Sequence, residues 1–212
     1  MARELEAYQL VERSLIKKFR KEIWNPFIEA VKNYNFISEN DVINVEVENN
    51  AKSLLSAMLL KQLGRVSEIP FKIEFVDKSS AGLCEKFHID TVDEFSEKGK
   101  LINTITYSDV VRKALKSIVF EHGASSILPA EKNTINPLYC IADEAVSAWV
   151  KYNNIDFPII ESSTDDIEID NLLKRLGSDV EHSIFKSTHA VCLDTIPAYI
   201  KDNTKHSYLE KY

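Results

Sequence analysis

The sequence predicts an α/β protein with a parallel sheet and a helical extension at its N-terminus. Two observations predict that class. From residue 42 onward, short apolar segments alternate with longer segments of helical spacing, as in sheets built from crossover units. Ahead of them, residues 3–23 carry apolar positions at helical spacing. We therefore divide the 212 residues into N-terminal helices over 1–36 and one α/β domain over 37–212.

The N-terminal segment predicts two helices. The first spans 3–23 and has a basic face opposite its apolar one, made of Arg13, Lys17, Lys18, Arg20 and Lys21. Asn25-Pro26 then has the order of a helix cap followed by a first-turn proline, so a second helix should run through about Asn33.

The α/β segment predicts three strands, each followed by a helix. The strands are expected at 42–47, 71–76 and 101–106. The helices that follow them are expected at 51–64, 79–87 and 108–122, with later helices at 142–153, 166–176 and 180–186.

The predicted strands alternate apolar and polar residues. Val45 and Val47 flank Glu46, whereas a strand covered on both faces should be apolar throughout. We therefore expect one packed face and one wetter face. An unpaired buried carboxylate would be costly, so Glu46 should find a cation, and Lys72 on the neighbouring strand is our candidate.

Composition excludes several classes of protein. Cys84, Cys140 and Cys192 are few and scattered, which excludes a disulfide framework and a C-x-x-C metal site and favours the cytoplasm. No apolar run is long enough to predict a membrane span. The net charge of −7 disfavours a broad nucleic-acid surface, although a local basic patch stays compatible with it.

The junction after the first strand is unlike a phosphate-binding loop. Such loops are usually rich in glycine, because backbone N–H groups must close around phosphate. Here the junction reads Glu48, Asn49, Asn50, Ala51, Lys52, Ser53. A carboxylate at about 4 Å from phosphate would cost roughly 4 kcal/mol at an effective dielectric near 20, or about a thousandfold in affinity.

Three segments of the chain resemble the tRNA 2-thiocytidine synthetase family of PP-loop ATP pyrophosphatases. They are "ERSLIKKFRKEIWNPFIEAVKNYNFISENDVINV", "INPLYCIADEAVSAW" and "SIFKSTHAVCLDT". The resemblance implies a PP-loop domain, which is Rossmann-like and similar to the adenine nucleotide alpha hydrolases. It also implies chemistry with ATP, magnesium, cysteine pairs and an iron–sulfur cluster.

This sequence departs from the family wherever that chemistry is expected. The family's S-G-G-x-D-S loop falls on Glu48–Ser53, of which only Ser53 matches. The family's second signature falls on "TITYSDVVRK", where Asp109 matches and Arg112 replaces a glutamate. Both of the family's cysteine pairs are absent. The first pair would lie on a helix that this sequence lacks between Phe75 and Ile102. We therefore expect ATP, magnesium and the cluster to be lost, and no metal or catalytic residue.

Two functions follow from this resemblance. The first is a non-catalytic PP-loop protein that serves tRNA modification as a binding or structural partner, as a homodimer or with an active thiolation enzyme. The alternative is an ATP-dependent thiolation or adenylating enzyme that uses Lys52 and Ser53 on the phosphates. The degenerate nucleotide site would then comprise Glu48, Asn49, Asn50, Lys52, Ser53 and Asp109.

The basic face of the first helix has two interpretations of equal weight. Arg13, Lys17, Lys18, Arg20 and Lys21 could contact a tRNA backbone or another protein's acidic surface, or they could form a solvated face. For Asp109, helix capping is favoured over metal binding. Packing is favoured over chemistry for His189, Cys192 and Asp194, and a metal on Cys84 and His88 is the weaker alternative.

Overall fold

The computed structural model describes residues 5–79, 81–96, 98–121, 123–158, 164–207 and 209. The chain begins with α1 (Ala7–Ile16), a π-helical turn (Arg20–Trp24) and α2 (Asn25–Asn33). The α/β elements are β1 (Val42–Val47), α3 (Ala51–Val66), β2 (Lys72–Asp77), α4 (Leu83–Lys86), β3 (Lys100–Ile102) and α5 (Tyr107–Val119). They continue with β4 (Ala130–Glu131), β5 (Thr134–Ile135), α6 (Asp143–Tyr152), α7 (Thr164–Leu176) and α8 (Ser178–Thr188). The described chain ends with a 3-10 turn (Leu193–Thr195) and a hairpin of β6 (Ala198–Lys201) and β7 (Thr204–Ser207).

The main sheet has the strand order β2-β1-β3-β5-β4. Strands β2, β1, β3 and β5 are parallel, and β4 joins the edge antiparallel to β5. The chain passes from β1 to β2 on one side, whereas β3 pairs with the other side of β1. The carboxyl ends of β1 and β3 therefore flank a topological switch point, where open α/β sheets bind ligands.

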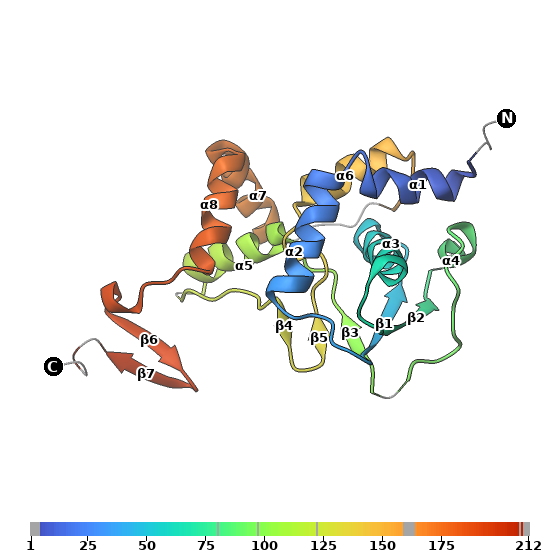
Figure 1. The fold of residues 1–212 in the computed structure, drawn as a ribbon. Coiled ribbons are helices and arrows are strands. Elements are labelled where there is room, and N and C mark those ends of the chain that lie inside the picture. Colours follow the sequence, from blue (N-terminus) through green and yellow to red (C-terminus); the bar gives the residue numbers. More distant parts are fainter. Residues whose placement is uncertain are drawn as a thin grey trace.

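One face of this sheet carries the hydrophobic core. Ile43, Val45 and Val47 of β1 are fully buried against α3, which contributes a nearly continuous set of buried residues. The N-terminal helices and α6 close the same core, and Trp149 of α6 donates a hydrogen bond to Ser14 of α1 at 3.1 Å. Figure 1 shows α1, α2, α3 and α6 grouped above the strands. The apolar faces of these helices, which the helical spacing in the sequence predicts, thus form one layer against the sheet that positions the switch point.

The other face is polar, as the alternation predicts, but its ion pair differs from our expectation. Glu46 is exposed and Lys72 pairs instead with Glu74 on its own strand, at 2.6 Å. Glu74 is 3% exposed and also accepts hydrogen bonds from the backbone N–H and hydroxyl of Ser96. The hydrogen bonds from Lys72 and then Ser96 lower the pKa of Glu74 to about 2. Glu46 needs no partner because water reaches it.

The predicted single helix over 3–23 is wrong in the structure, and its first two residues lie outside the described part. Helix α1 ends at Ile16, and two backbone bonds of the i to i−5 type follow: Phe19 N–H to Ser14 O at 2.9 Å and Trp24 N–H to Phe19 O at 3.2 Å. This wider π-helical turn keeps Phe19 and Ile23 in the core while the helix axis changes. The break divides the predicted basic face, because Arg13 lies in α1, Lys17 and Lys18 lie in the turn after it, and Arg20 and Lys21 lie in the π-helical turn.

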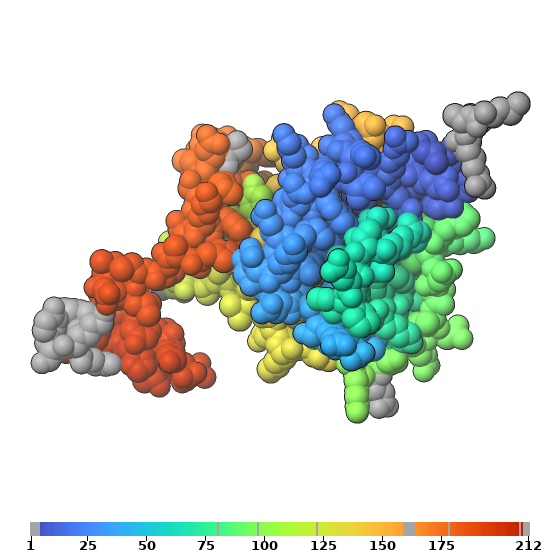
Figure 2. Space-filling view, in the orientation of Figure 1, coloured from blue at the N-terminus to red at the C-terminus, as the bar shows by residue number. Residues whose placement is uncertain are grey.

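Several other predicted bounds need correction. The expected strand 101–106 ends at Ile102, and the expected helix 79–87 forms only over Leu83–Lys86. Among the described residues of the crossover from β2 to β3, the only helix is thus the four-residue α4. Strands β4 to β7 were not predicted, because each is only two to four residues long. Figure 2 shows the β6–β7 hairpin standing away from the rest of the molecule.

Candidate functional site

The candidate site lies at the switch point, between the N-termini of α3 and α5. Three residues connect β1 to α3 and four connect β3 to α5, so both helix N-termini lie at the carboxyl edge of the sheet beside the switch point. Helix N-termini favour anions through their free N–H groups and their dipole. The side chains at the switch point therefore decide whether a phosphate can bind there.

The loop from Glu48 to Ser53 satisfies its own hydrogen bonds. Asn50 caps α3, because its side-chain oxygen accepts the Ser53 N–H at 2.8 Å. The Asn50 amide donates to the Glu48 carboxylate at 3.0 Å. The Ser53 hydroxyl is buried, accepts the Glu48 N–H at 2.9 Å and donates to the Glu46 carbonyl at 2.9 Å. Ser53 and Asn50 are thus engaged within the loop.

No residue between Glu48 and Ser53 has a positive φ angle, and Asn50 is extended at φ −145°. A glycine-rich phosphate loop relies on backbone conformations that bulky residues disfavour. This junction uses ordinary conformations, so side chains occupy the position where a backbone cradle would stand. Asn49 is half-buried and Glu48 is exposed.

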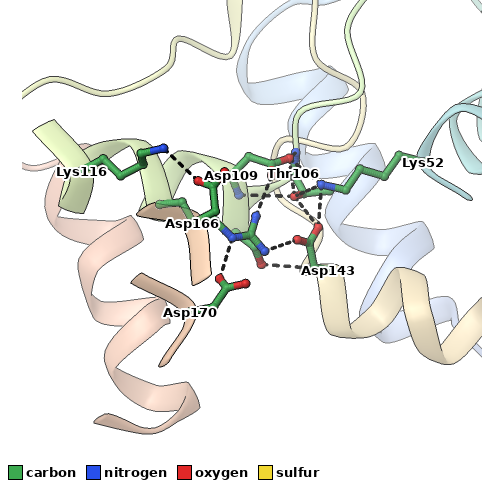
Figure 3. Close-up of polar contacts among 9 residues, drawn as sticks. Lys52, Thr106, Asp109, Lys116, Asp143, Asp166 and Asp170 are labelled. Atoms are coloured by element: carbon green, nitrogen blue, oxygen red, sulfur yellow. Dashed lines mark hydrogen bonds and ion pairs between the residues drawn. The ribbon is translucent and has the colours of Figure 1, made fainter. Parts of the chain in front are cut away.

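Lys52 extends from the first turn of α3 to two aspartates on other helices. Its Nζ atom lies 2.7 Å from Asp109 Oδ2 of α5 and 2.9 Å from Asp143 Oδ1 of α6. The Thr106 hydroxyl, which is buried, accepts a hydrogen bond from Lys52 at 3.2 Å and lies 2.7 Å from Asp143. Figure 3 shows these four side chains converging.

Arg112 extends the same network toward α7. It binds Asp109 at 2.7 Å, Asp143 at 2.5 Å and Asp170 of α7 at 2.8 Å. The network therefore joins α3, α5, α6 and α7 through two cations and three carboxylates, and Figure 3 shows Asp170 approaching from its own helix. We call these six residues the switch-point network: Lys52, Thr106, Asp109, Arg112, Asp143 and Asp170.

Charge pairing favours the ionised forms of Asp143 and Arg112. Burial raises the pKa of Asp143, but the Lys52 charge and the hydrogen bonds from Arg112, Lys52 and Thr106 outweigh burial and lower it. For Arg112, burial lowers the pKa, but hydrogen bonds to Asp143 and Asp170 outweigh burial and raise it above its usual value. Each charge is thus stabilised by a partner within the protein.

An incoming polyphosphate would meet more carboxylates than cations here. Two cations face three aspartates in the network, so both positive groups already have acidic partners. A hollow of about 360 Å³ beside the network is lined by Asp143, Asp170, Glu144 and Glu181 together with Arg112 and Lys174. Its charge is unfavourable for phosphate.

The cysteines do not form a site that fits an iron–sulfur cluster. Burial, and then the nearby Asp77, raise the pKa of the Cys84 thiol to about 12, and burial raises that of Cys140 to about 11. Such thiols resist the deprotonation that a metal ligand requires. Within the described ranges, no group of three or more His, Cys, Asp or Glu side chains could hold a metal ion.

The structure separates the predicted site residues into four sets. Lys52 and Asp109 meet in the switch-point network, whereas Glu48, Asn49, Asn50 and Ser53 form the loop at its edge. Arg13, Lys17 and Lys18 line a groove on another part of the molecule. Arg20 and Lys21 belong to the π-helical turn. Asp109 caps α5 as expected, in a capping box whose N-cap is Thr106.

Sequence reasoning missed Thr106, Asp143 and Asp170. The Thr106-x-x-Asp109 spacing is a capping-box signal that could have placed the start of α5 one residue earlier. Asp143 opens α6 beside Glu144, a charge pattern typical of a helix N-terminus. Nothing local indicates that Asp143 contacts Lys52 or that Asp170 contacts Arg112, because these contacts depend on how the helices pack.

Comparison with known proteins supports the fold. No protein-family model matches the chain, and no curated protein matches it. Among solved structures, it is similar to the U34-tRNA thiolase NcsA from Methanococcus maripaludis, determined with its 4Fe-4S cluster. The two share 13% sequence identity over 78% of this chain and 76% of that one, with a TM-score of 0.57. The chain therefore has an α/β fold with a mostly parallel sheet, as predicted, and this fold is similar to that of the thiolase.

The same described residues contain no helix that is both long enough and apolar enough to cross a membrane.

Proposed function

We propose that this chain is a non-catalytic PP-loop protein, related to the 2-thiocytidine synthetases and acting as a partner in tRNA modification. The observation that carries the proposal is the pairing of Lys52 with Asp109 and Asp143, at 2.7 and 2.9 Å, at the switch point. Phosphate would have to break both ion pairs and then face the two carboxylates. The link to tRNA rests on the resemblance in sequence and on the fold shared with a tRNA thiolase.

Thermal melting with and without ATP and Mg²⁺ tests the loss of nucleotide binding. A ligand at ten times its Kd would stabilise the protein by about 1.4 kcal/mol, which moves the melting temperature by a few degrees. We expect no shift at millimolar ATP and Mg²⁺, with Mg²⁺ alone and AMP as controls. A reproducible ATP-dependent shift would contradict the proposal.

One observation favours an adenylating enzyme as the second candidate. The side chains of Lys52, Asp109 and Asp143 are 25–28% exposed, so they are accessible to solvent. Lys52 could turn to a phosphate while the two aspartates bind Mg²⁺. In that case ATP would stabilise the wild type and fail to stabilise Lys52→Met, a pattern that the non-catalytic proposal does not produce.

For the partner, we propose a second copy of this chain or an active thiolation enzyme. Light scattering at micromolar concentration tests the first of these. A monomeric mass would exclude the homodimer and leave the thiolation enzyme as the partner to be tested by co-purification.

A further inference from the structure

The groove beside α1 is positively charged in a protein whose formal net charge is −7. It has a volume of about 620 Å³ and lies between α1, the end of α4 and the end of α6. Arg13, Lys17 and Lys18 line one side and Lys86 lines another. Among the described lining residues, none is acidic. We call this hollow the α1 groove.

The four cations of the α1 groove are available to a ligand. All four are exposed, and within the described ranges none forms an ion pair. The acidic residue of α1, Glu12, lies against α3 instead, where it binds Lys61 at 2.9 Å and Arg65 at 2.7 Å. The groove therefore keeps its positive charge although the protein as a whole is acidic.

An exposed aromatic ring stands among these cations. Tyr152, at the end of α6, is 56% exposed and lines the groove. Its ring lies edge to face with Phe19, with ring centroids 5.6 Å apart. Tyr8 lines the same groove and stacks on His88 at 4.1 Å. If the basic residues were only a solvated face, there would be no reason for an exposed tyrosine beside them.

We infer that the α1 groove binds single-stranded nucleic acid, with phosphates on Arg13, Lys17, Lys18 and Lys86 and a base stacked on Tyr152. Unpaired cations that follow a backbone, combined with an aromatic platform, are how proteins bind single strands without reading sequence. An acidic peptide would use the cations and leave the ring unused. The groove is separate from the switch point, so this inference holds whether or not ATP binds there.

Fluorescence anisotropy with a labelled unstructured 12-nucleotide RNA, and the same sequence as DNA, tests the inference. Three to four phosphate contacts predict a slope of about −2 to −3 for log K against log salt concentration. Tighter binding of RNA than of DNA would identify RNA as the natural ligand. Equal binding would show that the groove binds single strands of both kinds.

Matched charge reversals locate the site. Lys17→Glu with Lys18→Glu should weaken binding at least tenfold and flatten the salt slope. The control pair, Arg20→Glu with Lys21→Glu, changes net charge equally on exposed residues that do not line the groove, and should weaken binding less than the first pair does. Equal losses from the two pairs would overturn the location.

Substitutions at Tyr152 separate nucleic acid from an acidic protein. Tyr152→Ala should weaken binding about tenfold and Tyr152→Phe should leave it within twofold, because stacking needs only the ring. Melting temperatures of all variants show that they fold. The inference fails if polyglutamate binds as tightly as RNA, if Tyr152→Ala has no effect, or if neither strand binds at 50 mM salt.

Discussion

At the scale of single residues, the ion pairs of Lys52 are the main feature of the switch point. The residue stands in the first turn of α3, where a phosphate-binding protein keeps positive potential for its ligand. Here that charge is shared between Asp109 and Asp143, and Arg112 neutralises their remaining oxygens. One lysine thus serves as an internal partner for two aspartates on two other helices.

Lys52→Met tests this role. The change removes one of the two cations bound to Asp109 and Asp143, so we expect the free energy of unfolding at pH 7 to fall by about 1–3 kcal/mol, less than for a fully buried pair. As a control, Lys113→Met breaks an exposed pair with Glu121 and should cost under about 0.5 kcal/mol. Equal effects of the two substitutions in urea unfolding would contradict the assigned role.

The same variant should show a defined pH dependence. The pKa of Asp143 in the folded protein lies below the ordinary value of 3.8. The stability from this lowered pKa is therefore complete above about pH 4 and is lost as pH falls through the folded pKa. The deficit of Lys52→Met relative to wild type should thus be constant from pH 7 to 5 and should shrink below pH 4.

At the scale of elements, the polar face of the sheet is closed by a segment without regular structure. Asn44 of β1 is 4% exposed and donates to the Ser96 carbonyl at 3.2 Å, while Glu74 of β2 is bound by Ser96. The chain leading into β3 thus lies over the two strands in place of a helix. This arrangement depends on close approach at Gly99.

Gly99→Ala tests that close approach. A Cβ atom at residue 99 would lie 2.2–2.3 Å from the side-chain atoms of Asn44, which cannot move freely because they are buried. We expect a loss of about 1–3 kcal/mol in the free energy of unfolding. Gly123→Ala, which meets nothing within 4 Å, is the control. Adding Asn44→Ala should recover part of the loss, and two additive losses would argue against the contact.

At the scale of the whole molecule, the β6–β7 hairpin is set apart from the domain (Figure 2). Its strands pair with each other, and Tyr199 stacks on His206 across them at 5.0 Å. In the described part of the chain, neither strand pairs with the main sheet. The domain's hydrophobic core contains no buried residue from the hairpin.

Removal of residues 197–212 tests this separation. Because the core lies elsewhere, we expect the melting temperature of the shortened chain to stay within about 2 °C of the full chain, in circular dichroism at 222 nm. A decrease in melting temperature of more than about 5 °C would show that residues 197–212 stabilise the domain. The full chain measured on the same day is the reference.

Sequence alone determined the class of fold, the bounds of β1, the start of α3 and the polar face of the sheet. Each depends on residue periodicity or on a local cap such as Asn50, which neighbours in the chain decide. Only the tertiary structure decided that Lys52 meets Asp143, that Glu74 takes Lys72, and that Lys86 and Tyr152 join Lys17 in one groove. The reason is physical: partners on different elements are chosen by how helices and strands pack, and no local pattern encodes that packing.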